Sequence, residues 1–197
     1  MKHKWIIIVL SVLLSAAITC QSVWLANRGI PRVSLNLALH AYEAAFDDGA
    51  PDDLKLTIYY ISPAIVTRAP ICTLEQLKKF CNNDAGTQIE VGAEELSAHA
   101  EQFRELDADD LCPETVHSAV SGRGGRILGF LRMVYILERE DGEILLKIYA
   151  CNLVRDESVV VNGIKVKNDP IFYELIDPYL TDADRETLHW QHSWDKN

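Results

Sequence analysis

The sequence predicts an α+β protein, in which an N-terminal membrane segment is followed by one domain of helices packed on a mostly antiparallel sheet. Three observations support this class: an apolar N-terminal run, helical periodicity in the first half of the chain, and two hairpin patterns in the second half. A length of 197 residues fits one domain with an appendage. We place the membrane segment at residues 1–28 and the domain at residues 29–197.

The apolar N-terminal segment has basic residues at both ends. The run WIIIVLSVLL begins at Trp5, and Trp24 lies 19 residues further on, roughly 28 Å along a helix. This is close to the ~30 Å of bilayer hydrocarbon, at whose two interfaces tryptophan is enriched. The flanking basic residues are Lys2, Lys4, Arg28 and Arg32. We therefore expect residues 5–26 to contact the lipid bilayer as a signal-anchor transmembrane helix, single-pass and uncleaved.

Two alternatives for this segment remain open. A cleaved signal peptide would use the small residues Ser15 and Ala17, before Ile18, at its cleavage site. A lipoprotein would use Cys20, although Thr19 suits the preceding position poorly. Both alternatives, like the anchor, place the domain in an extracytoplasmic location.

The remainder of the chain is strongly acidic. Residues 29–197 hold 16 basic and 29 acidic side chains, a formal charge of −13. Such a domain repels phosphate backbones, so we expect no nucleic acid among its partners. The charge indicates either a solvated surface or an electrostatically steered encounter with a basic protein or a cation.

The sequence of the first half of the domain predicts helices around two strands. After a breaker at residues 29–32, we expect a helix from Ser34, its N-cap, to Phe46, although alternating leucines also permit a strand there. Strands are expected at residues 54–61 and 88–91. The other helices are expected to follow the Thr73–Gln76 capping box and to cover residues 94–106.

The sequence of the second half of the domain predicts hairpins followed by a helix. Strands are expected at residues 126–139 and 144–152, joined by a two-residue turn at Asp141-Gly142, and at either side of Asn162-Gly163. Asp169 and Pro170 are expected to start a helix, and residues 181–184 to cap another. We expect the helices to cover one face of the sheet and residues 189–197 to fray.

Cysteine usage permits disulfides in an oxidising location. The domain holds an even number of cysteines, namely Cys72, Cys81, Cys112 and Cys151. Cys72 and Cys81 flank one predicted helix, roughly 13 Å apart, which is too far for a bond between them. Any disulfide would therefore join each of them to Cys112 or Cys151, and free buried thiols are the alternative.

Metal and catalytic signals are weak. His189 and His192 lie three residues apart, a spacing that can share a metal on a helix, but they fall in the predicted tail. His40, His99 and His117 are isolated. Acidic clusters and a Gly-rich run depart from calcium and phosphate motifs and are interpreted as loops, at residues 47–53, 107–114 and 121–126. We expect no cofactor.

These observations favour a non-enzymatic binding or interaction module, although the absence of motifs leaves enzymatic activity uncertain. The expected partner, besides the bilayer, is another envelope protein or envelope component. The alternatives are a small-molecule or metal-binding sensor domain and an unrecognised envelope hydrolase whose groups assemble only in space.

Overall fold

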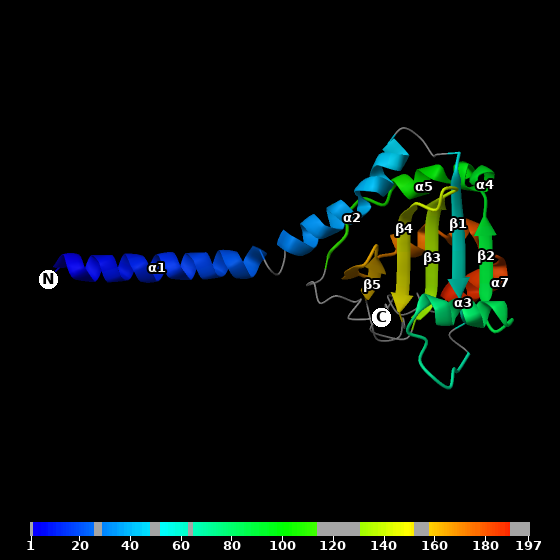
Figure 1. The fold of residues 1–197 in the computed structure, drawn as a ribbon, viewed down its shortest axis with the longest axis horizontal. Helices are drawn as coiled ribbons and strands as arrows, with labels where there is room; N and C mark the ends of the chain where they lie inside the picture. The colour runs from blue at the N-terminus through cyan, green and yellow to red at the C-terminus, as the bar shows by residue number, and fades with distance from the viewer. Residues whose placement is uncertain are drawn as a thin grey trace.

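The computed structural model describes residues 2–25, 29–47, 52–62, 65–113, 131–151 and 158–189. Within these ranges the side chains of residues 2–10, 13, 24, 47, 151, 158 and 187–189 are not described. The described part is α+β, with an antiparallel sheet and surrounding helices (Figure 1). The predicted fold class of the domain is therefore confirmed.

Six strands of the described residues pair antiparallel in the order β2-β1-β3-β4-β5-β6. Their bounds are Leu54–Tyr60 for β1, Thr87–Val91 for β2, Leu131–Arg139 for β3, Ile144–Cys151 for β4, Ser158–Val161 for β5 and Ile164–Lys167 for β6. The edges are thus β2 and β6, and β3, one of the two longest strands, lies near the middle. The outer side of β6 is bridged to Pro113, and the N–H of Lys167 donates to the Cys112 carbonyl at 2.9 Å.

The helices are interspersed with these strands. Their bounds are Lys2–Trp24 for α1, Ile30–Asp47 for α2, Leu74–Asn82 for α3, Ala93–Ala98 for α4, Ala100–Arg104 for α5, Ile171–Glu174 for α6 and Asp182–His189 for α7, with a 3₁₀ turn η2 at Asp177–Tyr179. Helix α1 extends away from the domain, and α2 connects it to the sheet (Figure 1). Within the described residues, no helix combines the length and apolarity needed to cross a bilayer. The predicted run from Trp5 lies largely among side chains that are not described.

Both faces of the sheet are apolar and both are covered. Leu56, Ile58 and Tyr135 point into the larger core beneath α2, α4, α5 and α6. Val134 and Val160 point to the other face, where they belong to a second core that includes Leu77 of α3. The prediction that helices cover one face is therefore wrong. The reason is that β1, β3 and β5 carry apolar residues at successive positions, so each face needs a cover.

Two of the helices have boundaries that differ from the predicted ones. Helix α2 begins at Ile30 rather than after Ser34, because Pro31 is tolerated in a first turn, where its missing N–H needs no partner. The predicted helix over residues 94–106 is divided at His99, whose φ and ψ are −120° and 19°. The capping box between Thr73 and Gln76 is confirmed in both directions.

The two hairpins differ in their turns. Asn162 and Gly163 have φ of 45° and 87°, so the predicted two-residue turn is confirmed. At the first hairpin only Gly142 has positive φ, 89°, and the N–H of Gly142 donates to the Arg139 carbonyl. This is a three-residue loop ending in a glycine bulge, so the predicted two-residue turn at Asp141-Gly142 is wrong. The predicted strand start at residues 126–130 lies outside the described residues.

The side chain of Asn162 joins the second hairpin to β4 and α2. Its Oδ1 accepts the N–H of Lys147 at 2.7 Å. Its Nδ2 donates to the carbonyls of Ala38 at 2.7 Å and Leu145 at 2.9 Å. One turn residue therefore fixes both the hairpin and the position of α2 above the sheet.

We predict that Asn162→Ala lowers the free energy of unfolding by about 3–4 kcal/mol. It removes three hydrogen bonds worth about 1 kcal/mol each and places alanine in the left-handed region. Asn162→Gly loses the same bonds but keeps the turn, so it should recover about 1 kcal/mol of that loss. Urea unfolding of the full chain in detergent micelles would measure both, and two variants as stable as the wild type would refute the role given to this side chain.

Candidate functional site

A groove opens between α2 and the segment that follows α5. It encloses about 610 Å³ and is lined by Asn36, Tyr42, Glu43, Phe46, Phe103, Arg104, Leu106, Asp107, Ala108 and Asp109. A second hollow of about 230 Å³ is lined by Glu105, Leu106, Asp107, Asp110, Leu111, Asp169, Ile171 and Glu174. The two hollows share Leu106 and Asp107, so we treat them together as the acidic groove.

The backbone of Ala108 is fixed to α2 from both sides. Its N–H donates to Glu43 Oε1 at 3.2 Å, and its carbonyl accepts from Arg32 Nη1. Asp107 closes the turn that follows, since its Oδ1 accepts the N–H of Asp109 at 2.7 Å. These contacts agree with interpreting residues 107–110 as a loop at a helix end, while Glu114 lies outside the described residues.

Aromatic packing holds α5 against α2. The rings of Phe46 and Phe103 stack with centroids 5.7 Å apart, and Tyr42 lies 5.0 Å from Phe46. The Tyr42 hydroxyl donates to the Phe103 carbonyl, and Arg104 Nε donates to the Phe46 carbonyl at 3.3 Å. Burial raises the pKa of Tyr42 well above its ordinary value, so this hydroxyl stays protonated and acts as a donor, not as a base.

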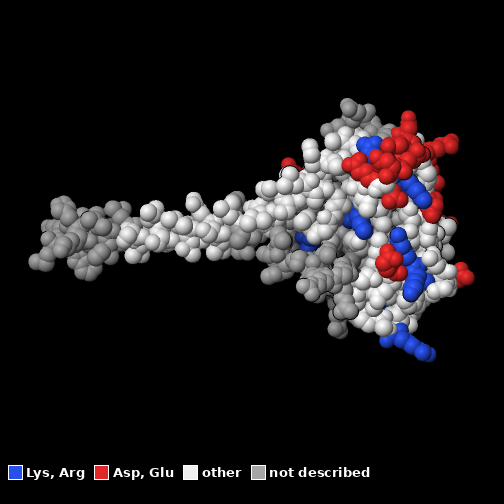
Figure 2. All heavy atoms as spheres, viewed as in Figure 1, with Lys and Arg blue, Asp and Glu red and all other residues white. Residues whose placement is uncertain are grey.

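Negative charge dominates the acidic groove. Among the described residues that line it, one carries a guanidinium, Arg104, which pairs with Glu101 at 2.5 Å. Seven carry carboxylates: Glu43, Glu105, Asp107, Asp109, Asp110, Asp169 and Glu174. Figure 2 shows acidic side chains gathered at the end of the domain where α4 and α5 lie. The arrangement favours a cationic ligand over an anionic one.

The structure does not describe the side chains of the two predicted metal candidates, His189 and His192. In the described part of the chain, no group of three or more His, Cys, Asp or Glu side chains could hold a metal ion. The side chain of His189, at the end of α7, and all of His192 lie outside the described residues, as do His117 and the Gly-rich run at residues 121–126. The metal hypothesis for His189 and His192 therefore stays a prediction.

His40, His99 and Asp53 are not among the described residues that line the acidic groove. His40 is exposed on α2, and His99 meets the ring of Tyr179 edge-on at 5.5 Å. Asp53 binds Arg139 Nη1 through both carboxylate oxygens at 3.0 Å, which joins the start of β1 to the end of β3. Asp53 therefore has a structural role as the ion-pair partner of Arg139.

The cysteines of the described part are free thiols at Cys20, Cys72, Cys81 and Cys112. Cys81 is buried under the sheet, where its thiol contacts the Thr87 carbonyl at 3.2 Å, and burial raises its pKa. Of the other two domain cysteines that are described, Cys72 is partly exposed and Cys112 is exposed. Because the side chain of Cys151 is not described, the disulfide hypothesis and the alternative of free buried thiols both stay predictions.

A separate apolar hollow of about 430 Å³ lies beside α3. It is lined by Gln76, Phe80 and residues 65–71, of which Val66 is 92% exposed. Carboxylates are absent from its described lining, so it differs in character from the acidic groove. The alternative that this chain is a small-molecule sensor stays a prediction. Under that alternative, this hollow is where a small molecule would bind.

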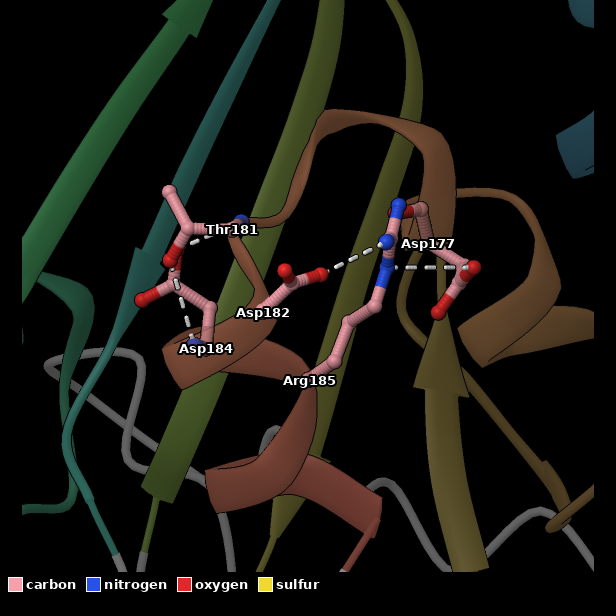
Figure 3. Close-up of polar contacts among 5 residues, drawn as sticks. All are labelled: Asp177, Thr181, Asp182, Asp184 and Arg185. Atoms are coloured by element: carbon pink, nitrogen blue, oxygen red, sulfur yellow. Dashed lines mark hydrogen bonds and ion pairs between the residues drawn. The ribbon is translucent and has the colours of Figure 1, made fainter.

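A polar cluster fixes the start of α7 to the sheet (Figure 3). Thr181 and Asp184 cap the helix reciprocally, because Asp184 N–H donates to Thr181 Oγ1 at 3.2 Å and Thr181 N–H donates to Asp184 Oδ2 at 2.9 Å. The predicted cap at residues 181–184 is confirmed. Arg185 donates to the Asp177 carbonyl at 3.0 Å, and the Tyr60 hydroxyl of β1 donates to Asp184. All these charges are used within the molecule, which indicates a structural role.

Comparison with protein-family models, curated proteins and solved structures finds no match to this chain.

We predict that Asp184→Asn destabilises the protein in a pH-dependent manner. Partial burial alone would raise the pKa of Asp184, but hydrogen bonds from Thr181 and Tyr60 outweigh it and lower the pKa below its ordinary 3.8. A carboxylate with a depressed folded-state pKa stabilises the fold above its unfolded pKa, and this contribution is lost as the pH falls through the folded value. The variant should therefore lose about 1 kcal/mol at pH 7, a typical capping contribution, and progressively less below pH 3.8.

Asp182→Asn is the matched control, since Asp182 is fully exposed and pairs only weakly with Arg185 at 3.3 Å. Urea unfolding of the full chain at pH 7 and at low pH compares the two. If the difference in unfolding free energy between Asp184→Asn and the wild type stayed constant over this pH range, the lowered pKa given to Asp184 would be contradicted.

Proposed function

We propose that this chain is a membrane-tethered, extracytoplasmic binding module whose acidic groove docks a basic segment of another envelope protein. The observation that carries the proposal is that the described lining of two hollows, which share Leu106 and Asp107, holds seven carboxylates and one guanidinium. In this proposal the domain binds its partner and performs no reaction on it.

Charge supports a cationic partner. Residues 43–197 hold 15 basic and 29 acidic side chains, a formal charge of −14. A field of this sign raises the encounter rate with a basic partner and slows the approach of anionic ones. Arginine in particular can form bidentate hydrogen bonds with carboxylates such as those of the groove.

Fixed geometry supports binding at this place. The groove wall is held by the contacts of Ala108 with Arg32 and Glu43, and by the stacked rings of Phe46 and Phe103. A preformed wall reduces the ordering cost that a partner must overcome on binding.

The tether is supported by the sequence and by the shape of the chain. The apolar run from Trp5, its basic flanks and the 19-residue interval to Trp24 are typical of an anchor. Helix α1 has 23 residues and extends away from the sheet (Figure 1), with Val12, Leu14 and Ile18 all more than half exposed. The positive-inside tendency of Lys2 and Lys4 favours an extracytoplasmic domain.

The first test of the proposed function measures binding of an octa-arginine peptide to the full chain in nanodiscs of zwitterionic lipid. Neutralising the groove with Glu105→Gln, Asp109→Asn and Asp110→Asn should weaken binding about tenfold or more, because each lost contact is worth up to about 1 kcal/mol. The control variant removes the same charge elsewhere, with Glu75→Gln, Glu94→Gln and Glu95→Gln. Fluorescence anisotropy would report both dissociation constants.

Equal weakening by the two triple variants would show that only net charge matters, and the groove would lose its role. Absence of peptide binding to the wild type at low ionic strength would refute the cationic partner. All six substituted carboxylates are exposed, so neither variant is expected to disturb folding.

The second test asks on which side of the membrane the domain lies. A membrane-impermeant amine reagent added to intact cells should label lysines of the domain, such as Lys79, which is exposed on α3. Mass spectrometry of the captured complexes would then identify the neighbouring envelope protein. A domain that is labelled only after the cells are broken would overturn the proposed topology, and release of the chain by alkaline carbonate would overturn the uncleaved tether.

A further inference from the structure

Helix α2 has two apolar faces, and the sheet covers one of them. Leu35, Leu39 and Tyr42 are buried against the core. On the opposite side Ile30, Val33 and Leu37 are 54%, 60% and 73% exposed. Ala41 and Ala44 continue this second line and are also exposed. We call these five residues the outer stripe.

The spacing within the outer stripe is that of a helix–helix seam. Its members follow one another at intervals of three, four, four and three residues, which keeps them on one side of the helix. Single exposed apolar residues are common and need no explanation, but a continuous line of them on a helix marks a contact surface. At ~1.5 Å per residue the stripe is roughly 21 Å long.

Charge indicates what the stripe contacts. The sequence contains no acidic residue before Glu43, whereas residues 43–197 carry a formal charge of −14. Two copies of this chain would repel one another across most surfaces of the domain. The charged side chains of Arg32 and Glu43 are turned to Ala108, away from the stripe. The stripe is therefore a surface on which two such acidic domains can approach closely.

We propose that the outer stripe of α2 is the seam of a parallel homodimer. This inference rests on the proposed tether, because two chains anchored in one membrane emerge side by side and in the same orientation. Only residues 25–29 separate α1 from α2, so each stripe residue meets its own counterpart across a two-fold axis. The tether also supplies the local concentration that a seam of about three turns needs.

The dimer would place two acidic grooves on either side of the seam. Asn36 lines the groove and directly precedes Leu37 of the stripe. A partner with two basic segments, or a dimeric partner, would then bind both grooves at once and gain avidity.

The test is disulfide cross-linking of the full chain in its native membrane. The parent carries Ser in place of Cys20, Cys72, Cys112 and Cys151, which leaves buried Cys81 as its one thiol. Into it are introduced Val33→Cys or Leu37→Cys on the stripe, or Ser97→Cys at an exposed position of α4 as the control. Oxidation should give a covalent dimer at least tenfold more abundant for the stripe positions than for Ser97→Cys. Equal yields at all three positions would overturn the seam.

A second variant tests the same surface without oxidation. The fraction of dimers in vesicles is counted by single-molecule photobleaching. Val33→Glu with Leu37→Glu should reduce this fraction to the level expected when two chains enter one vesicle by chance. Gln88→Glu with Ser97→Glu should leave it unchanged. A dimer fraction that survives the stripe substitutions would refute the seam.

The competing occupant of the stripe is the lipid surface. A nitroxide on Leu37→Cys should show dipolar broadening from its counterpart in the dimer. A label that shows no broadening and is accessible to oxygen dissolved in the bilayer would mean that the stripe lies on lipid, which would also refute the seam.

Failure of the seam and failure of the tether give different results. If the chain stays in carbonate-washed membranes but Leu37→Cys does not cross-link, the seam is wrong and the tether stands. If carbonate releases the chain and the cross-link is lost as well, the tether is wrong and the dimer that depends on it falls with it.

Discussion

The side-chain amide of Asn162 is the contact on which the arrangement of helix and sheet depends. It accepts from the backbone of β4 and donates both to β4 and to the Ala38 carbonyl in the middle of α2. A helix lying on a sheet by apolar contact alone could slide or rotate, because dispersion and burial are not directional. Burial of its apolar stripe selects the inward face of α2, and this hydrogen bond fixes where that face lies on the sheet. This orientation is the one in which Leu35 and Leu39 are buried, Leu37 points outward and Glu43 reaches Ala108.

Local chemistry explains how much of the fold the sequence could predict. The Asn162-Gly163 turn, the capping box at Thr73 and the cap at Thr181 involve residues within a few positions of one another, and all three are as predicted. Boundaries that depend on distant contacts were missed, such as the break at His99, whose ring packs on Tyr179. The second covered face was also missed, although the successive apolar residues of β1, β3 and β5 are visible in the sequence and are typical of strands buried on both faces.

The acidic groove could not be predicted, because three separate parts of the sequence form it. Glu43 comes from α2, Asp107 from the loop after α5, and Glu174 from α6. In the sequence these residues belong to ordinary acidic helix ends and loops. The only available signal was the repeated clustering of acids at such ends, which gave the correct local interpretation as loops but no information about their proximity. The two histidines singled out for their spacing lie where the structure gives no side-chain position.

The edges of the sheet have a consequence for solubility at high local density. Strand β2 is five residues long and presents Gln88 and Glu90 to solvent, with Glu90 paired to Lys55 at 3.2 Å. Strand β6 is four residues long, and its outer backbone is already partly paired with Cys112 and Pro113. Short, charged or occupied edges are poor templates for a strand from another molecule. Many copies can therefore crowd together without the sheet of one molecule adding a strand from the next.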